Sequence, residues 1–317
     1  LDPEQAMKAD APKIHPEGNI IGGKPVQLVR GDIDKAFKEA DLVYENNYRT
    51  SMLQHATGES AVCVAQWQNG KLTVWDSTQY TFDVQKGVAK ALKVPMSKVR
   101  VICDYMGGGF GDRSSPKRYN VLASLLTKKT GRPVKIQFSR EENFLAGHHR
   151  YPTIWHLKYG VKKDGTLIAL YAKVIADMGA YVLFAGAGDS LETMKSVYRC
   201  PNVKVDSRMV ITHNPITTAM RGVGCPQVTY GLEGAMDSLA QKLGMGPFEL
   251  RQKNYVAKGG TLPTLQPIKN AVLLPETWKA AEQALDKALA RNKEKYAKLS
   301  PTLLRGRGHT SNMTGYG

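Results

Sequence analysis

Short runs of alternating hydrophobic and polar residues are the dominant pattern along this chain, and they predict strands paired as hairpins. Residues 61–79 hold two such runs on either side of Asn69-Gly70, a dipeptide that favours a tight primed turn. Residues 153–181 hold a second pair of runs, which turns at Lys163-Asp164-Gly165. Further strands are expected over residues 42–50, 98–105, 133–139 and 203–212.

Hydrophobic residues at helical spacing predict helices between these strands. The strongest pattern covers residues 228–244 and ends at Gly244, and another covers 119–131 and ends at Gly131. One face carries Leu232, Ala235, Met236, Leu239 and Leu243 in the first helix, and Leu122, Leu125 and Leu126 in the second. The other expected helices cover 81–94, 275–299 and a short segment that is capped by Asp32 or Asp34 and ends near Ala40.

Hairpins occur together with alternation of strands and helices. The predicted fold class is therefore α+β, with mixed β-sheets and packed helices, and not a doubly wound parallel sheet. Residues 1–25 are polar and rich in proline, so they are expected to form an extended lead-in linker.

The balance of charged residues adds little to the fold but limits the function. The formal net charge is +16, from 44 Lys and Arg residues against 28 Asp and Glu residues. The basic residues are dispersed, and no cluster is interleaved with aromatic residues as in an RNA-binding strand. A solvated basic surface is favoured over nucleic-acid binding, and docking of an acidic partner is the other alternative.

The cysteines are scattered at Cys63, Cys103, Cys200 and Cys225, and no two of them form a CxxC pair. The sequence therefore predicts neither a zinc site nor an iron–sulfur cluster within this chain. Free buried thiols are typical of a reducing compartment, so a cytoplasmic location is expected. No run of about eighteen apolar residues occurs, and no membrane span is predicted.

A glycine run, GGGFG at 107–111, follows directly on an expected strand. It lacks the Lys-Ser/Thr of a P-loop, and it fits a dinucleotide fingerprint only in part. Glycine lets the backbone come close to a ligand and point amide N–H groups at an oxygen atom. The run is therefore either a ligand loop with Phe110 as a pocket wall, or a structural turn.

Two other segments precede expected helices in a similar way. Arg221 lies in a glycine-spaced loop before the strongest helix, where it suits an anion held near the helix N-terminus. Gln79 ends the first hairpin just before a helix. Taken alone, Arg221 is equally compatible with a surface arginine in a turn, and Gln79 is more typical of an exposed cap residue.

Six short segments, in this order, resemble the molybdenum-binding subunit of the xanthine dehydrogenase and aldehyde oxidase family. They are STQ at 77–79, GGGFG at 107–111, SREE at 139–142, DMGAY at 177–181, YRCPNV at 198–203 and AMRGVGCPQ at 219–227. LGMGPFELRQKN at 243–254 continues the series. Each segment alone is a weak signal, but the ordered set covers the chain from about Ala11 onward.

The resemblance implies that the chain binds a molybdenum–molybdopterin cofactor. Gln79 matches the glutamine that hydrogen-bonds the apical oxo ligand of molybdenum. Phe110 with Gly111 matches the loop whose amide reaches the metal's oxygen ligands, and Arg221 matches an arginine beside the cofactor. Gly109 and Gly222 belong to the same two loops. These residues act on the metal through hydrogen bonds, because its direct ligands are the pterin dithiolene, oxygen, and sulfur or selenium.

Three positions differ from the purine-oxidising members of that family. Ser114 stands where those members carry a glutamate, Asp189 where they carry an arginine, and Val223 where they carry an aromatic residue. These three residues are the candidate substrate contacts. They favour an aldehyde, an N-heterocycle or an aromatic thioester over xanthine.

The resemblance also implies a domain division and an incomplete active site. Residues 26–300 are expected to form the first molybdenum-cofactor-binding domain, and residues 301–317 to begin a second half that is truncated or supplied by another chain. No catalytic residue is expected in this chain, because the general-base glutamate belongs to that second half. His55 and Glu59 are expected to orient the hairpin and not to catalyse.

The implied activity is hydroxylation of a carbon centre with water as the oxygen source. Electrons would pass to [2Fe-2S] clusters and FAD on partner subunits. The cytosine dinucleotide is one of the forms of the pterin that the resemblance allows. The expected partners are a second molybdenum-domain chain, an iron–sulfur subunit and a flavin subunit. The alternatives are a non-catalytic structural subunit of such a complex and, less favoured, a basic nucleic-acid-binding protein.

Overall fold

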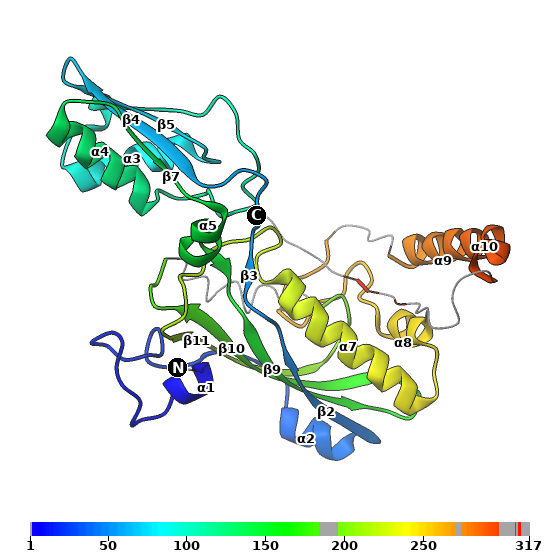
Figure 1. Cartoon of the computed structure of the whole chain (residues 1–317). Coiled ribbons are helices and arrows are strands. Elements are labelled where there is room, and N and C mark those ends of the chain that lie inside the picture. Colours follow the sequence, from blue (N-terminus) through cyan, green and yellow to red (C-terminus); the bar gives the residue numbers. More distant parts are fainter. Residues whose placement is uncertain (1, 184–195, 270–273, 298–307, 309, 312–317) are drawn as a thin grey trace.

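The computed structural model describes residues 2–183, 196–269, 274–297, 308 and 310–311. Figure 1 shows two lobes, each built on its own β-sheet, with the small lobe above the large lobe. The small lobe comprises residues 61–138, and the large lobe comprises the described residues before 55 and after 148. Asp189 and most of residues 301–317 lie outside the described residues.

The small lobe contains a four-stranded sheet in the order β6-β5-β4-β7. Its strands are β4 (Val62–Gln68), β5 (Lys71–Asp76), β6 (Val99–Ile102) and β7 (Val134–Gln137). The predicted hairpin is confirmed: Gln68 pairs with Lys71, and Asn69 and Gly70 have φ values of +50° and +72°. After a short 3₁₀ turn (Met96–Lys98), β6 joins β5 in parallel, which makes the sheet mixed.

Two helices, α3 (Thr81–Leu92) and α4 (Arg118–Thr130), pack together on this sheet. Gly131 ends α4 with a φ of +69°, as its sequence predicts. The leucine face of α4 points outward, however, with Leu122, Leu125 and Leu126 all exposed. The side of α4 that packs inward is formed by Tyr119, Asn120, Ala123, Ser124 and Thr127. Small and hydrogen-bonding side chains therefore make this interface, because the helix lies close to the sheet.

The large lobe contains a five-stranded sheet in the order β1-β11-β10-β9-β2. Its strands are β1 (Val26–Arg30), β2 (Leu42–Arg49), β9 (Thr153–Val161), β10 (Leu167–Gly179) and β11 (Asn202–Ile211). β9 and β10 form the second predicted hairpin, and β10 pairs with β11 in parallel. Both sheets thus mix parallel and antiparallel pairs, and the predicted α+β class is confirmed.

Helix α7 (Cys225–Leu243) covers one face of the large sheet and buries the predicted residues Leu232, Ala235, Met236 and Leu239. They pack with Trp155, Leu157 and Tyr159 of β9 in the main core. The short helices α1 (Pro3–Ala6) and α2 (Ile33–Glu39) pack on β10 and β11. Asp32 caps α2, and α1 lies within the segment that was expected to be extended.

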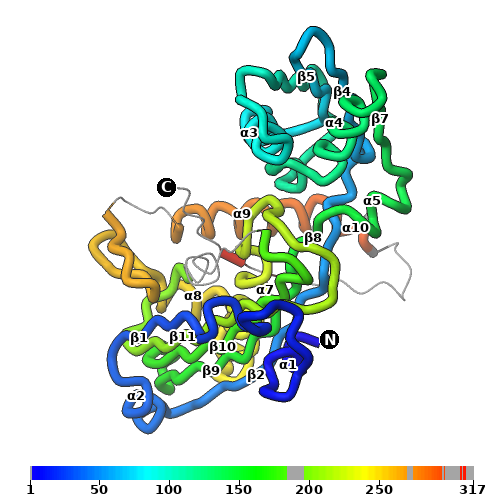
Figure 2. The backbone as a smooth tube through the Cα atoms, turned by 90° about the vertical axis from the view of Figure 1, so that its left-hand side faces the viewer, coloured from blue at the N-terminus to red at the C-terminus, as the bar shows by residue number. Residues whose placement is uncertain are grey.

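The chain crosses between the lobes near a two-stranded ribbon. Strand β3 (Leu53–Gln54) pairs there with β8 (His149–Arg150), and α5 (Arg140–Ala146) lies just before β8. The remaining helices are α8 (Pro247–Asn254), α9 (Leu274–Arg291) and α10 (Lys293–Ala297). Figure 2 shows β8 and α5 at the junction below the small lobe, which is where the loops described next come together.

Candidate functional site

Three loops that are far apart in the sequence meet where the two lobes join. Gln79 follows β5, the glycine run follows β6, and Arg221 precedes α7. The N–H of Gly111 donates to Gln79 Oε1 at 2.7 Å, and the N–H of Arg221 donates to the Phe110 carbonyl at 2.8 Å. The Arg221 guanidinium carbon lies 5.5 Å from the centre of the Phe110 ring. The structure therefore brings these residues into one group.

The close approach of these loops explains why glycine occupies the run. A Cβ atom at Gly109 would meet the side chain of Gln79, and one at Gly111 would meet the carbonyl of Ala219. Gly111 has a φ of +104°, in the region that favours glycine. Phe110 also has a positive φ, +53°, and its ring is 42% exposed. An aromatic residue in this conformation is strained, and the surrounding contacts maintain it.

An ion pair between the buried Arg113 and the half-buried Glu59 fastens the glycine run to the hairpin. Glu59 Oε2 accepts hydrogen bonds from Ser77 Oγ at 2.5 Å, the N–H of Gly107 at 2.8 Å and the Arg113 guanidinium at 2.6 Å. The carbonyl of Arg113 in turn accepts the N–H of Gln79 at 2.9 Å. Burial acts to raise the pKa of Glu59, but these hydrogen bonds outweigh it and hold the pKa below its usual range.

Two other side chains, His55 beside β3 and Arg150 of β8, hold the Arg221 loop at the junction between the lobes. The ring nitrogens of His55 face the carbonyl oxygens of His148 at 3.2 Å and Ala219 at 3.0 Å. Arg150 donates to the carbonyl of Arg221 at 2.7 Å and to Gln227 Oε1 at 3.0 Å. The sequence pattern did not single out Arg113 or Arg150 as site residues. A buried arginine has no local sequence signal, because its partners come from other elements.

The side chains of the group end in unpaired donors. Gln79 and Arg221 are exposed. Within the described part of the chain, the Gln79 amide nitrogen and the Phe110 N–H have no hydrogen-bond partner, and Arg221 forms no ion pair. The hydrogen bonds of Gln79 Oε1 and of the backbone thus position Gln79, Phe110 and Arg221. The Gln79 amide nitrogen, the Phe110 N–H and the Arg221 guanidinium remain free for a ligand.

The predicted substrate contacts lie beside this group. Ser114 Oγ donates to the carbonyl of Gly111 at 2.6 Å, within the loop itself. Val223 packs on a small apolar cluster that includes Tyr151 and Met178. Gly222 has a φ of +76° in the turn that leads into α7. The structure does not describe Asp189, so that prediction stays open.

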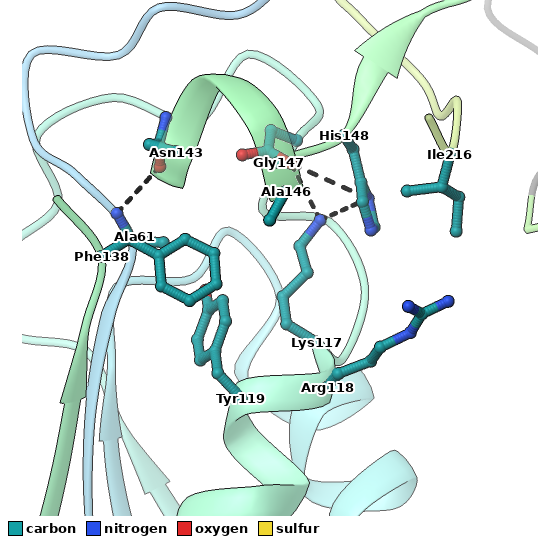
Figure 3. A pocket seen from close by; sticks show the side chains of 11 residues that line it. Ala61, Lys117, Arg118, Tyr119, Phe138, Asn143, Ala146, Gly147, His148 and Ile216 are labelled. Carbon is teal, nitrogen blue, oxygen red and sulfur yellow. Dashed lines mark hydrogen bonds and ion pairs between the residues drawn. The ribbon is translucent and has the colours of Figure 1, made fainter. Parts of the chain in front are cut away.

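A second polar group lies just beyond the glycine run, and it is buried. The Lys117 ammonium group donates to Asp112 Oδ1 at 2.9 Å and to His148 Nδ1 at 2.6 Å. Burial lowers the pKa of Lys117, although Asp112 opposes this effect. Burial and the Lys117 charge lower the pKa of His148 to about 3, so its ring is neutral and can accept this hydrogen bond. Figure 3 shows the contact between Lys117 and His148 beside a cavity.

The described residues contain neither a cluster of metal-ligating side chains nor a membrane-spanning helix. No group of three or more His, Cys, Asp or Glu side chains there is arranged to hold a metal ion directly. Among the same residues, no helix is both long enough and apolar enough to cross a membrane.

Comparison with known proteins identifies the family. Residues 14–255 match the family described as the molybdopterin cofactor-binding domain. The chain belongs to this family. It is homologous to the molybdenum-binding subunits of the xanthine dehydrogenase and aldehyde oxidoreductase group, as the resemblance predicted.

Two relatives show the extent of the match. The chain is 39% identical over 287 residues to the nicotinate dehydrogenase large molybdopterin subunit of Eubacterium barkeri, covering 89% of this chain and 67% of that protein. It is 34% identical over 264 residues to the xanthine dehydrogenase molybdenum-binding subunit of Escherichia coli O157:H7, covering 82% and 35% respectively. The chain therefore spans about two thirds of the first relative and about a third of the second.

Two solved structures have the same fold. Aldehyde oxidoreductase from Desulfovibrio gigas superposes with a TM-score of 0.84 at 29% identity, covering 94% of this chain and 32% of that one. Quinoline 2-oxidoreductase from Pseudomonas putida 86 superposes with a TM-score of 0.84 at 26% identity, covering 93% and 38%. The molybdopterin-binding fold thus includes both lobes.

The geometry of the three loops fits an oxygen-bearing cofactor. The glycines let the three loops approach closely enough to bring their donors together, and the free donors of Gln79 and Phe110 suit oxygen acceptors. The unpaired guanidinium of Arg221 suits an anionic group. A hydrophobic ligand alone would leave all these donors unsatisfied.

Proposed function

We propose that this chain is the molybdenum-cofactor-binding subunit of a hydroxylase that oxidises an electron-poor carbon with water as the oxygen source. One observation carries the proposal: Gln79, the Gly109–Gly111 backbone and Arg221 converge, and within the described residues the Gln79 amide, the Phe110 N–H and the Arg221 guanidinium are left without hydrogen-bond or ion-pair partners. The match of residues 14–255 to the molybdopterin cofactor-binding domain supports this interpretation.

Each residue of the group has a defined task in the proposal. The Gln79 amide N–H and the Phe110 backbone N–H would hold the bound cofactor by donating hydrogen bonds to its oxygen atoms. Arg221 places a positive charge beside the cofactor, and its stacking on Phe110 keeps the guanidinium in position. When bound, the molybdenum centre supplies the two-electron acceptor and the activated oxygen. The Phe110 ring forms a wall of the substrate space.

The substrate is proposed to be an N-heterocycle. Ser114 and Val223 provide no carboxylate or aromatic clamp of the kind that purine-oxidising members carry. Two relatives are named for N-heterocyclic substrates, nicotinate dehydrogenase and quinoline 2-oxidoreductase. Among the three substrate classes that the sequence favours, these names support the N-heterocycle most directly.

The iron–sulfur and flavin centres are proposed to lie on partner subunits. The chain covers only about a third of the xanthine dehydrogenase and aldehyde oxidoreductase relatives, and the relative from Eubacterium barkeri is named as one subunit. The [2Fe-2S] clusters and FAD are assigned to such partners, and the base glutamate to the second half of the molybdenum domain, whether it follows on this chain or is supplied by another. Residues 26–300 are proposed as the first cofactor-binding domain and 301–317 as the start of a second half.

Metal analysis and turnover of the complex purified with its partner chains test this proposal. Gln79→Ala is expected to lower turnover about a hundredfold, as the loss of one oriented donor does in other active sites. Gln68→Ala is the matched control, because Gln68 is exposed at the hairpin turn. An active complex without molybdenum or tungsten would reject the proposal. Full turnover in both Gln79→Ala and Phe110→Ala would favour the non-catalytic subunit.

A further inference from the structure

A cavity of about 140 Å³ lies between the start of α4, the end of α5 and strand β7. It is lined on one side by charged and polar groups and on the other by aromatic and aliphatic side chains (Figure 3). None of Gln79, Phe110 and Arg221 lines it. The cavity is therefore separate from the candidate cofactor site, although Asp112 directly follows the glycine run.

The polar side of the cavity carries more N–H donors than the protein uses. The Lys117 ammonium has three N–H groups, and Asp112 and His148 accept two of them. Because His148 Nδ1 accepts from Lys117, its proton lies on Nε2, which has no hydrogen-bond partner among the described residues. Arg118 lies at the exposed edge of the cavity, with its guanidinium carbon 4.4 Å from the ring centre of Tyr181.

The charges that line the cavity leave it positive. Lys117 and Arg118 contribute two positive charges, Asp112 contributes one negative charge, and His148 is neutral. The ion pair between Lys117 and Asp112 has an Nζ to Oδ1 distance of 2.9 Å, so these two charges offset each other. The guanidinium at the edge is left to attract one negative charge.

The opposite side of the cavity is suited to a flat ring. Tyr119 and Phe138 meet edge to face, with ring centres 5.4 Å apart, and Ala61 and Ala146 add small apolar surfaces. A cavity of about 150 Å³ with apolar walls binds one benzene ring. A single six-membered ring therefore fits this volume, and a bicyclic one does not.

We propose that this cavity binds a monocyclic aromatic carboxylate, with its ring against Phe138 and Tyr119 and its carboxylate toward Lys117, His148 and Arg118. The chemistry requires both parts of the ligand, because the donors need an acceptor and the apolar walls need a ring. Binding here does not depend on molybdenum, so this inference and the proposed function can fail separately.

Isothermal titration of the full chain with benzoate tests the proposal, with benzamide and acetate as probes that lack the charge or the ring. Benzoate is expected to bind about tenfold more tightly than either probe. Benzamide loses the charge-assisted hydrogen bonds, and acetate loses the ring contacts. Arg118→Gln is expected to weaken benzoate binding about tenfold, because it removes the charge at the edge. Ala146→Leu, at an exposed helix position, is expected to fill the cavity and abolish binding.

Lys129→Gln is the matched control, since Lys129 is exposed on the same helix and does not line the cavity. Circular dichroism of each variant checks that the fold is retained. Absence of benzoate binding to the folded chain would overturn the proposal. Equal binding of benzoate and benzamide, equal binding of benzoate and acetate, or unchanged binding to Ala146→Leu would each overturn it as well.

Discussion

Two polar groups lie beside the glycine run. One is exposed and its charge has no ion-pair partner among the described residues, whereas the other is buried and its charges are paired. In the candidate cofactor site, Gln79 and Arg221 are exposed, and their donors are free among the described residues. A few residues further on, Asp112 and Lys117 are only 8% exposed and pair with each other. The open group, Gln79 with Arg221, leaves its donors free for a ligand. The closed group, Asp112 with Lys117, pairs its charges and so stabilises the loop that carries the open group.

The ion pair between Glu59 and Arg113 joins the two groups. Arg113 is 2% exposed, and its side chain and backbone carbonyl contact residues just before β4 and just after β5, at the open end of the hairpin. Breaking this pair by removing Glu59 is costly, because the buried Arg113 guanidinium would remain without its partner. This ion pair therefore fixes the backbone of Gln79, whose amide donors are free.

Removing the lysine of the closed group is expected to have the largest effect on stability. Lys117→Met leaves the Asp112 carboxylate buried without its cation, which should lower the free energy of unfolding by about 3–5 kcal/mol. Urea denaturation followed by circular dichroism measures this change. The double variant Lys117→Met with Asp112→Asn removes both charges and should recover most of the loss. A loss below about 1 kcal/mol in the single variant would contradict the contrast between the two groups.

The pH dependence of stability tests whether the pKa of Asp76, a buried carboxyl group at the end of β5, is raised. Burial raises the pKa of Asp76 to about 6, despite Asn120 and Arg113 nearby. The folded chain thus holds this proton more tightly than the unfolded chain. Stability should therefore fall as the pH rises from about 4 to about 6, by about 3 kcal/mol at most.

Asp76→Asn should abolish this component, and the comparison of urea midpoints across that pH range isolates it. Asp112 and Glu59 contribute with the opposite sign, because each has a lowered pKa and loses its stabilising effect only as the pH falls below about 4. The same pH profile in the variant and the parent chain would show that Asp76 ionises normally.

Glycine 111 should show how closely the loops approach one another. Gly111→Ala introduces a side chain at a φ of +104° and against the carbonyl of Ala219, so we expect a loss of about 2 kcal/mol. Gly131→Ala is the matched control, because Gly131 has a φ of +69° but open space around it. Thermal denaturation of both variants should show the larger loss for Gly111→Ala. Equal losses would mean that the loops can move apart.

Substitutions in the open group should have the smallest effect on stability. Arg221→Gln removes an exposed guanidinium, so the free energy of unfolding should change by no more than about 0.5 kcal/mol. Under the proposed function, the same variant should retain less molybdenum in the purified complex, as measured by elemental analysis. Arg113→Gln provides the contrast, since a buried and paired arginine should cost stability. A strongly destabilised Arg221→Gln variant would mean that this residue is part of the support.

Much of the fold follows from local patterns. Asn69-Gly70 turns the first hairpin, Asp32 caps α2, and Gly131 and Gly244 end their helices. Each feature depends on the conformational preferences of a few adjacent residues, so the sequence is enough to predict it. The ordered motifs also pointed to the loops of the candidate site.

Other features required contacts that local patterns do not contain. The leucine face of α4 looked like an inward face by its spacing, but the structure exposes it and buries Asn120, Ser124 and Thr127 instead. Arg150 and Arg113 acquire their roles from partners in other elements, such as Glu59, which is 54 residues from Arg113 along the chain. The aromatic wall of the cavity likewise depends on how α4 packs against β7.

By itself, the sequence of this protein determined the turns, the caps, most of the helices and strands, and the membership of Gln79, Phe110 and Arg221 in recognisable motifs. Only the tertiary structure decided which charges are paired, which donors stay free and where a cavity opens. The physical reason is that backbone preferences act between neighbours along the chain. Pairing and burial depend instead on which distant segments come within a few ångströms of each other.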